Sequence, residues 1–83
     1  NRESGFGRYD VMLEPFDKSK TAYILEFKVH NPRTEDSLED TVSKALLQID
    51  EKNYDAELIA DGFRKEQICH FGFAFEGKHV LIG

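Results

Sequence analysis

The chain has 83 residues, the size of one small domain or part of one. Hydrophobic residues make up 40% and charged residues 33%, which is typical of a globular domain and too apolar for a disordered segment. Sixteen acidic and 11 basic residues give a net charge of −5. This charge argues against a broad basic surface for nucleic acid, but it permits a local site in which acidic side chains hold a metal.

Targeting signals and cysteine content suggest where the protein resides. No apolar run approaches the ~20 residues that a membrane-spanning helix needs, and residues 1–10 contain no signal-peptide hydrophobic core. Cys69 is the only cysteine, which excludes an internal disulfide and a paired-cysteine zinc site and favours a reducing compartment. We therefore expect a cytoplasmic protein that has no contact with a membrane.

The first half of the chain predicts a β-hairpin followed by a helix. In residues 9–14 and 22–29, a set of apolar side chains recurs at every second position, as in a β-strand. The polar stretch between these segments predicts the hairpin loop. Residues 34–52 carry apolar side chains at helical spacing, and Asp36 or Ser37 is suited to cap the helix.

The second half predicts a short helix and a second hairpin. Residues 54–61 have helical character and are followed by Gly62, which is suited to end a helix. Residues 67–75 predict a strand, which a tight turn joins to a final strand at 79–82. The helical connection between the second and third strands is long enough for a parallel crossover. The expected fold class is therefore α/β (α+β), a small mixed sheet with a helix on one face.

The most informative feature is a set of charged residues in the first hairpin. Glu26 and Lys28 lie two residues apart on an otherwise apolar strand, so both side chains leave the same face. If the loop is centred near Lys18, paired residues have numbers that sum to 36, and Asp10 lies opposite Glu26. Facing carboxylates repel, and Mg²⁺ or Mn²⁺ would remove the repulsion. These residues alone leave a metal site and an ordinary ion pair with Lys28 equally open.

A longer pattern surrounds these charged positions. It runs through Glu3-Ser4-Gly5-x-Gly7-Arg8-Tyr9-Asp10-Val11, Ile24-Leu25-Glu26-Phe27-Lys28, Ala45-Leu46-x-Gln48-Ile49, Tyr54 and Phe71-Gly72-x-Ala74-Phe75-x-Gly77-Lys78-x-Val80. The pattern resembles the PD-(D/E)XK nuclease superfamily, and more closely the nuclease-like domain at the C-terminus of a group of bacterial AAA-ATPase-like proteins. The resemblance implies a restriction-endonuclease-like core.

The resemblance also implies roles for individual residues. Asp10 and Glu26 would bind Mg²⁺ or Mn²⁺, and Lys28 would be the catalytic lysine. Gln48 would support the site from the following helix, and Tyr54 would have an auxiliary, substrate-binding role. Without the resemblance, the residues themselves favour an ordinary helix-flank amide for Gln48 and a core aromatic for Tyr54.

The implied function is metal-dependent hydrolysis of phosphodiester bonds in DNA. Arg8 belongs to a group of basic residues around the first hairpin that would contact the phosphate backbone or would simply be solvated. An ATPase-like region of the same protein is the implied partner. Cleavage of RNA by the same residues is a weaker option.

The pattern departs from the superfamily at its beginning. The superfamily core usually starts with a helix and a strand ahead of the strand that carries the aspartate, so the single domain expected over residues 1–83 would be truncated at its N-terminus and would expose apolar surface there. This departure and the acidic charge support an alternative, a catalytically inactive nuclease-fold module for interaction or regulation that is attached to an ATPase-like protein. A homo-oligomer is compatible with both functions.

The remaining residues with reactive side chains are expected to be structural. His30 continues the face of Glu26 and is predicted to be a solvated histidine at the end of its strand. Cys69 lies in an apolar strand face and is predicted to be a core residue. His70 and His79 are predicted to pack on the surface or across the terminal hairpin, since the sequence there supplies no further zinc ligands.

Overall fold

The computed structural model describes residues 2–4 and 7–83, with side chains from Asp10 onward. Two sheets are present. Strands β1 (Arg2–Ser4) and β2 (Gly7–Tyr9) form a small antiparallel sheet. The main sheet has the order β3-β4-β5-β6, formed by β3 (Val11–Leu13), β4 (Ala22–Val29), β5 (Ile68–Glu76) and β6 (His79–Ile82).

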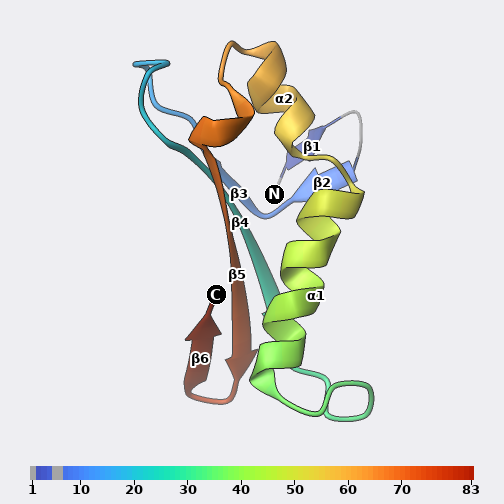
Figure 1. Cartoon of the computed structure of the whole chain (residues 1–83). Helices are drawn as coiled ribbons and strands as arrows, with labels where there is room; N and C mark the ends of the chain where they lie inside the picture. The colour runs from blue at the N-terminus through green and yellow to red at the C-terminus, as the bar shows by residue number, and fades with distance from the viewer. Residues whose placement is uncertain (1, 5–6) are drawn as a thin grey trace.

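Helices connect β4 to β5. They are α1 (Leu38–Glu51), α2 (Asp55–Ala60) and the short 3-10 helix η1 (Lys65–Gln67). The Ser37 side chain caps α1 by accepting the backbone N–H of Asp40 at 3.3 Å. Helix α1 runs alongside the main sheet on one side (Figure 1). Within the described chain, no helix is long and apolar enough to cross a membrane. The α+β fold predicted from the sequence is confirmed, with a mixed sheet and a helical crossover.

The register of the first hairpin matches the prediction. Val11 lies opposite Leu25 and Met12 lies opposite Ile24, so the residue numbers of each pair sum to 36. The predicted strand 9–14 is wrong in one respect: it is divided into β2 and β3 by a bend at Asp10. Strand β5 then pairs with β4 in parallel, as expected for the helical crossover.

The core lies between the main sheet and the helices. One contiguous cluster of buried apolar residues consists of Ala22, Ile24, Ile49, Tyr54, Leu58 and Phe63. Helix α1 packs closely against β5 at Gly72, where an added Cβ would lie 3.0 Å from the Ala45 Cβ and 3.0 Å from the carbonyl oxygen of Val42. Two small residues therefore set the spacing between helix and sheet, and through it the position of every side chain that α1 presents to β4.

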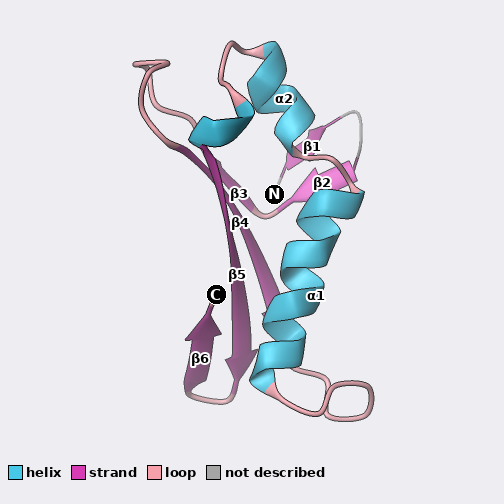
Figure 2. Ribbon diagram, viewed as in Figure 1, coloured by secondary structure: helices cyan, strands magenta, loops and turns pink. Residues whose placement is uncertain are grey.

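The opposite face of the main sheet is uncharged, and we call it the open face. The register places on it the side chains of Val11, Leu13, Tyr23, Leu25, Phe27, Val29, Cys69, Phe71, Phe73, Phe75, Val80 and Ile82. In the described part of the chain, the helices lie on the other side of the sheet (Figure 2). Val29 is accordingly 79% exposed and Ile82 51% exposed. The prediction that Cys69 is a core residue is wrong, because its strand face is not covered and the side chain is exposed.

Candidate active site

Glu26 is the buried centre of a polar cluster between β4 and α1. It lies on the helix-facing side of β4 and is only 5% exposed. The side-chain amide of Gln48 donates to Glu26 Oε2 at 2.8 Å. Glu26 Oε1 is also buried and has no hydrogen-bond partner among the described residues. A buried carboxylate oxygen without a partner is costly, so this atom is suited to a ligand that the protein itself does not supply.

Asp10 lies at the bend between β2 and β3, where the hairpin register places it opposite Glu26. Its Oδ2 accepts the backbone N–H of Phe27 at 2.7 Å, which fixes this carboxylate beside the residue that follows Glu26. Burial raises the pKa of Glu26 to about 7, and the negative charge of Asp10 contributes to the rise. The two carboxylates predicted to face each other are therefore close enough to interact electrostatically.

Lys28 follows Glu26 on the same face of β4 and is half-buried. Its positive charge opposes the rise in the pKa of Glu26, although burial and the charge of Asp10 outweigh it. An ammonium group and two carboxylates thus share one region of the sheet. This is the set of charges that the spacing of the sequence predicts.

Helix α1 and the turn after it supply the other two side chains of the cluster. Gln48 is half-buried on α1, and its Nε2 lies 3.5 Å from the hydroxyl oxygen of Tyr54. Tyr54 is 1% exposed and belongs to the hydrophobic core, as its pattern predicts, while its hydroxyl extends to the polar cluster. The structure therefore brings Gln48 to Glu26, and the Tyr54 hydroxyl to Gln48. The Arg8 side chain lies outside the described part of the structure.

The donor set fits a hard divalent cation. Mg²⁺ is commonly held by one or two protein carboxylates, with water and substrate phosphate as its other ligands. Glu26 offers a buried oxygen without a partner, and Asp10 offers a second carboxylate beside it. Among the described side chains, no group of three or more His, Cys, Asp or Glu residues is placed to hold a metal ion. Water and substrate would therefore supply the remaining ligands.

A second polar cluster lies at the end of β4, and the sequence did not reveal it. The predicted solvated His30 is wrong: its side chain is 6% exposed, and Nδ1 lies 2.7 Å from Thr41 Oγ1. The Thr41 hydroxyl donates to Glu35 Oε1 at 2.7 Å, and the backbone N–H of Asn31 donates to the same oxygen at 2.8 Å. Lys44 Nζ lies 3.3 Å from Glu35 Oε2. The cluster joins the loop after β4 to α1.

The hydrogen bonds of Glu35 have an electrostatic consequence. The backbone N–H of Asn31, followed by the Thr41 hydroxyl, lowers the pKa of Glu35 to about 2. Glu35 is 7% exposed, so it is a buried carboxylate that hydrogen bonds keep ionised. In the sequence, Glu35 is an acidic residue four positions after Asn31 and just ahead of a helix. This pattern does not distinguish a buried acidic side chain from a solvated one.

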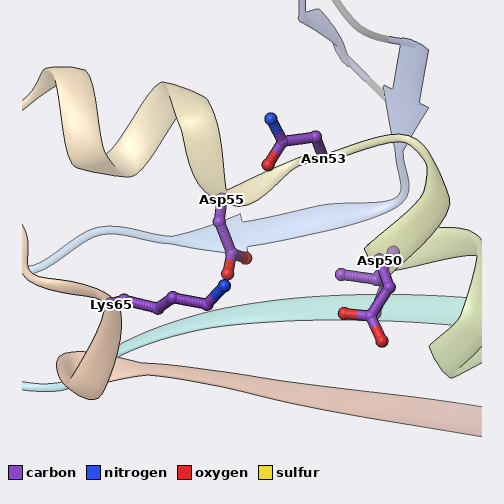
Figure 3. Close-up of a pocket in the computed structure, with 5 residues that line it drawn as sticks. Asp50, Asn53, Asp55 and Lys65 are labelled. Atoms are coloured by element: carbon purple, nitrogen blue, oxygen red, sulfur yellow. The ribbon is translucent and has the colours of Figure 1, made fainter.

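A shallow pocket of about 320 Å³ lies where α1, α2 and η1 meet. Asp50, Asn53, Asp55 and Lys65 line it, with the Lys65 side chain directed toward Asp55 (Figure 3). Close by, His70 Nε2 lies 2.5 Å from Asp55 Oδ1. Of the two predicted placements of His70, packing across the terminal hairpin is wrong, because β6 pairs only with the last part of β5; the side chain is instead partly exposed beside Asp55.

Comparison with known proteins identifies the family. A family model described as the PD-(D/E)XK nuclease superfamily matches residues 1–83. No curated protein and no solved structure matches the chain significantly. The match covers the whole chain, and the Asp10, Glu26 and Lys28 positions form one cluster in the fold. The chain belongs to the PD-(D/E)XK nuclease superfamily.

Proposed function

We propose that this chain is a metal-dependent nuclease domain that hydrolyses phosphodiester bonds in DNA. Asp10 and Glu26 would hold Mg²⁺ or Mn²⁺, and Lys28 would assist the reaction. The observation that carries the proposal is Glu26 Oε1, a buried carboxylate oxygen that has no hydrogen-bond partner in the described part of the chain and lies on the same sheet face as an ammonium group. Membership of a nuclease superfamily supports the reaction class.

The reaction needs a nucleophile and stabilisation of the negative charge that develops on the phosphate. A bound divalent cation supplies charge stabilisation and lowers the pKa of water. Water attacks phosphorus, a new P–O bond forms and one ester P–O bond breaks. The attacking water loses its proton to solvent, and the leaving oxygen gains one from solvent. The ammonium of Lys28 donates hydrogen bonds to the attacking water or to a phosphoryl oxygen and offsets the developing charge.

The other residues of the cluster position these groups. The amide of Gln48 donates to Glu26 Oε2 and so leaves Oε1 as the candidate ligand atom. The backbone N–H of Phe27 holds the Asp10 carboxylate. We assign both contacts a positioning role, because an error of about 1 Å in such a site lowers the rate substantially.

Metal binding is the first test. We would titrate Mn²⁺ and Mg²⁺ by calorimetry against the wild type, Asp10→Ala and the control Glu51→Ala, which removes an exposed carboxylate at the end of α1. Binding should be lost in Asp10→Ala and retained in Glu51→Ala. Equal binding by all three proteins would remove the proposed metal site.

Cleavage is the second test. We would incubate supercoiled plasmid DNA with the wild type, Lys28→Ala and the control Lys52→Ala, an exposed lysine just after α1, with Mg²⁺ or Mn²⁺. Nicking should disappear only in Lys28→Ala, and single-stranded RNA in parallel reactions would test the substrate class. If the chain binds metal but cuts neither nucleic acid, the proposed catalysis is wrong. The alternative of an inactive interaction module attached to an ATPase-like region would then be supported.

A further inference from the structure

We propose that two copies of this chain associate through their open faces, sheet against sheet. The inference does not depend on nuclease activity. It rests on the area of the open face, its lack of charge and the fixed arrangement of its aromatic rings.

The area of the open face is close to what a stable dimer requires. Seven of its residues are exposed by between 36% and 79%. At about 150–200 Å² for a fully exposed large apolar residue, they leave roughly 500–700 Å² of apolar surface in one patch. The largest patch on a typical monomer measures about 300–600 Å², and a standard interface buries about 800 Å² on each partner. The five other residues of the face, including the exposed Cys69, add to this area.

Among the side chains that the structure describes, none on the open face is charged, and this selects the kind of partner. Phosphate groups of a nucleic acid would find no cation there. A charged protein surface would lose its hydration without gaining an ion pair. The matching partner is another uncharged apolar sheet face, and each chain carries one. The competing occupant is the helix and strand with which the superfamily core usually begins, and a monomeric wild type would favour that occupant. Two identical faces related by a two-fold axis satisfy each other completely, as in an isologous dimer.

The aromatic rings of the open face are already ordered. Phe27 and Phe73 form an edge-to-face pair with ring centroids 4.9 Å apart. Tyr23 and Phe71 stack at 6.0 Å, and Phe73 and Phe75 stack at 6.5 Å. Because neighbouring rings hold one another in place, little side-chain entropy is lost when a partner covers them. Such a surface resembles one half of a sheet-on-sheet core, in which facing sheets lie about 10 Å apart.

The proposed dimer leaves the candidate active site accessible. Glu26 and Lys28 extend from the helix-facing side of β4, whereas the open face is the other side. In the dimer, each copy would present its metal-binding cluster on the outer side. Association and catalysis can therefore be tested separately.

Sedimentation equilibrium tests the proposal. The protein concentration should range from roughly 1 to 300 µM, so that a dimer of low affinity is also detected. The wild type should move from the monomer mass toward twice that mass. Val29→Lys and Ile82→Lys place a charge at two positions of the open face that are exposed in the monomer, so both should fold and stay monomeric. The control Leu47→Lys, at a 54% exposed position on α1, should dimerise like the wild type. A monomeric wild type, or a dimer that survives Val29→Lys, would overturn the proposal.

The reactivity of Cys69 measures independently which surface becomes buried when the chain dimerises. It is a free, exposed cysteine on the open face, so its reaction with a thiol reagent should slow as the wild type dimerises. In Val29→Lys the rate should not depend on protein concentration. If the wild type dimerises while Cys69 stays fully reactive, association uses another surface, such as the free edge of β6, and the open-face dimer is wrong.

Discussion

Gln48 on α1 donates its side-chain amide to Glu26 Oε2 on β4 at 2.8 Å, across 22 residues of sequence. This contact connects α1 to the helix-facing side of the main sheet. It occupies one oxygen of the buried carboxylate, while the other has no partner among the side chains and backbone groups that the structure describes. The candidate metal site therefore depends on how α1 is placed, as well as on the two strands that carry its charges.

Replacing Gln48 with alanine should weaken metal binding. The amide donor favours the ionised form of Glu26, which is the form that binds a cation, so its loss favours the protonated form. We expect Mg²⁺ or Mn²⁺ affinity near pH 7 to fall by about tenfold, a usual effect of removing a group that orients a metal ligand. Calorimetry should show the change, and Ser43→Ala on the exposed side of α1 serves as control. Unchanged affinity in Gln48→Ala would mean that the contact does not orient the ligand.

Glu26 should make the metal-free protein less stable as the pH rises. Its pKa is raised from 4.5 to about 7 by burial first and then by the charge of Asp10. The folded state therefore binds more protons than the unfolded state between these values, and the free energy of unfolding falls as the pH increases through this window. Glu26→Gln removes the titration, so the variant should be the more stable protein above pH 7 and should lose this advantage near pH 4.5.

Urea denaturation in a chelating buffer, repeated across this pH window, measures the effect of Glu26. Added Mg²⁺ should stabilise the wild type but not Glu26→Gln, because a ligand that binds only the folded state shifts the unfolding equilibrium. A variant that is less stable than the wild type at every pH would contradict the prediction.

Glu35 should have the opposite pH dependence. The hydrogen bond from the Asn31 N–H, followed by that from the Thr41 hydroxyl, lowers the pKa of Glu35 from 4.5 to about 2. The stability that this carboxylate provides is complete above pH 4.5 and is lost as the pH falls toward 2. Glu35→Gln should therefore unfold at a lower urea concentration than the wild type at neutral pH, and the difference should shrink on acidification. The exposed Glu39→Gln is the matched control. A difference that does not depend on pH would assign the effect to packing instead.

Gly72 should be sensitive to an added side chain. An added Cβ would lie 3.0 Å from both the Ala45 Cβ and the carbonyl oxygen of Val42, so the helix backbone would have to shift by a few tenths of an ångström to relieve the second contact. Gly72→Ala should destabilise the fold by about 1–3 kcal/mol, the usual range for overpacking a core. In a double-mutant cycle, the variant carrying both Gly72→Ala and Ala45→Gly should lose less stability than the sum of the losses in the two single variants. The reason is that Ala45→Gly removes one of the two close contacts. Simple additivity of the two substitutions would show that Ala45 is not the obstacle.

The sequence by itself determined the elements and the register of the first hairpin. Alternating polarity and a polar loop centred near Lys18 are local signals, and they place Asp10 opposite Glu26 without any knowledge of the rest of the fold. The Ser37 cap and the positive φ of Gly62 after α2 follow from equally local preferences. The facing of the two carboxylates was predictable for this reason, whereas their role as metal ligands was implied by the family resemblance.

Only the tertiary structure decided which face of the sheet is covered. Both faces of β4 carry large apolar residues, and alternation shows which side chains share a face but not which face meets the helix. The crossover from β4 to β5 sets that choice, and with it the burial of Glu26, the contact with Gln48 and the exposure of Phe27. His30 and Cys69 were assigned wrongly for the same reason. Burial depends on contacts between distant segments, which no local pattern contains.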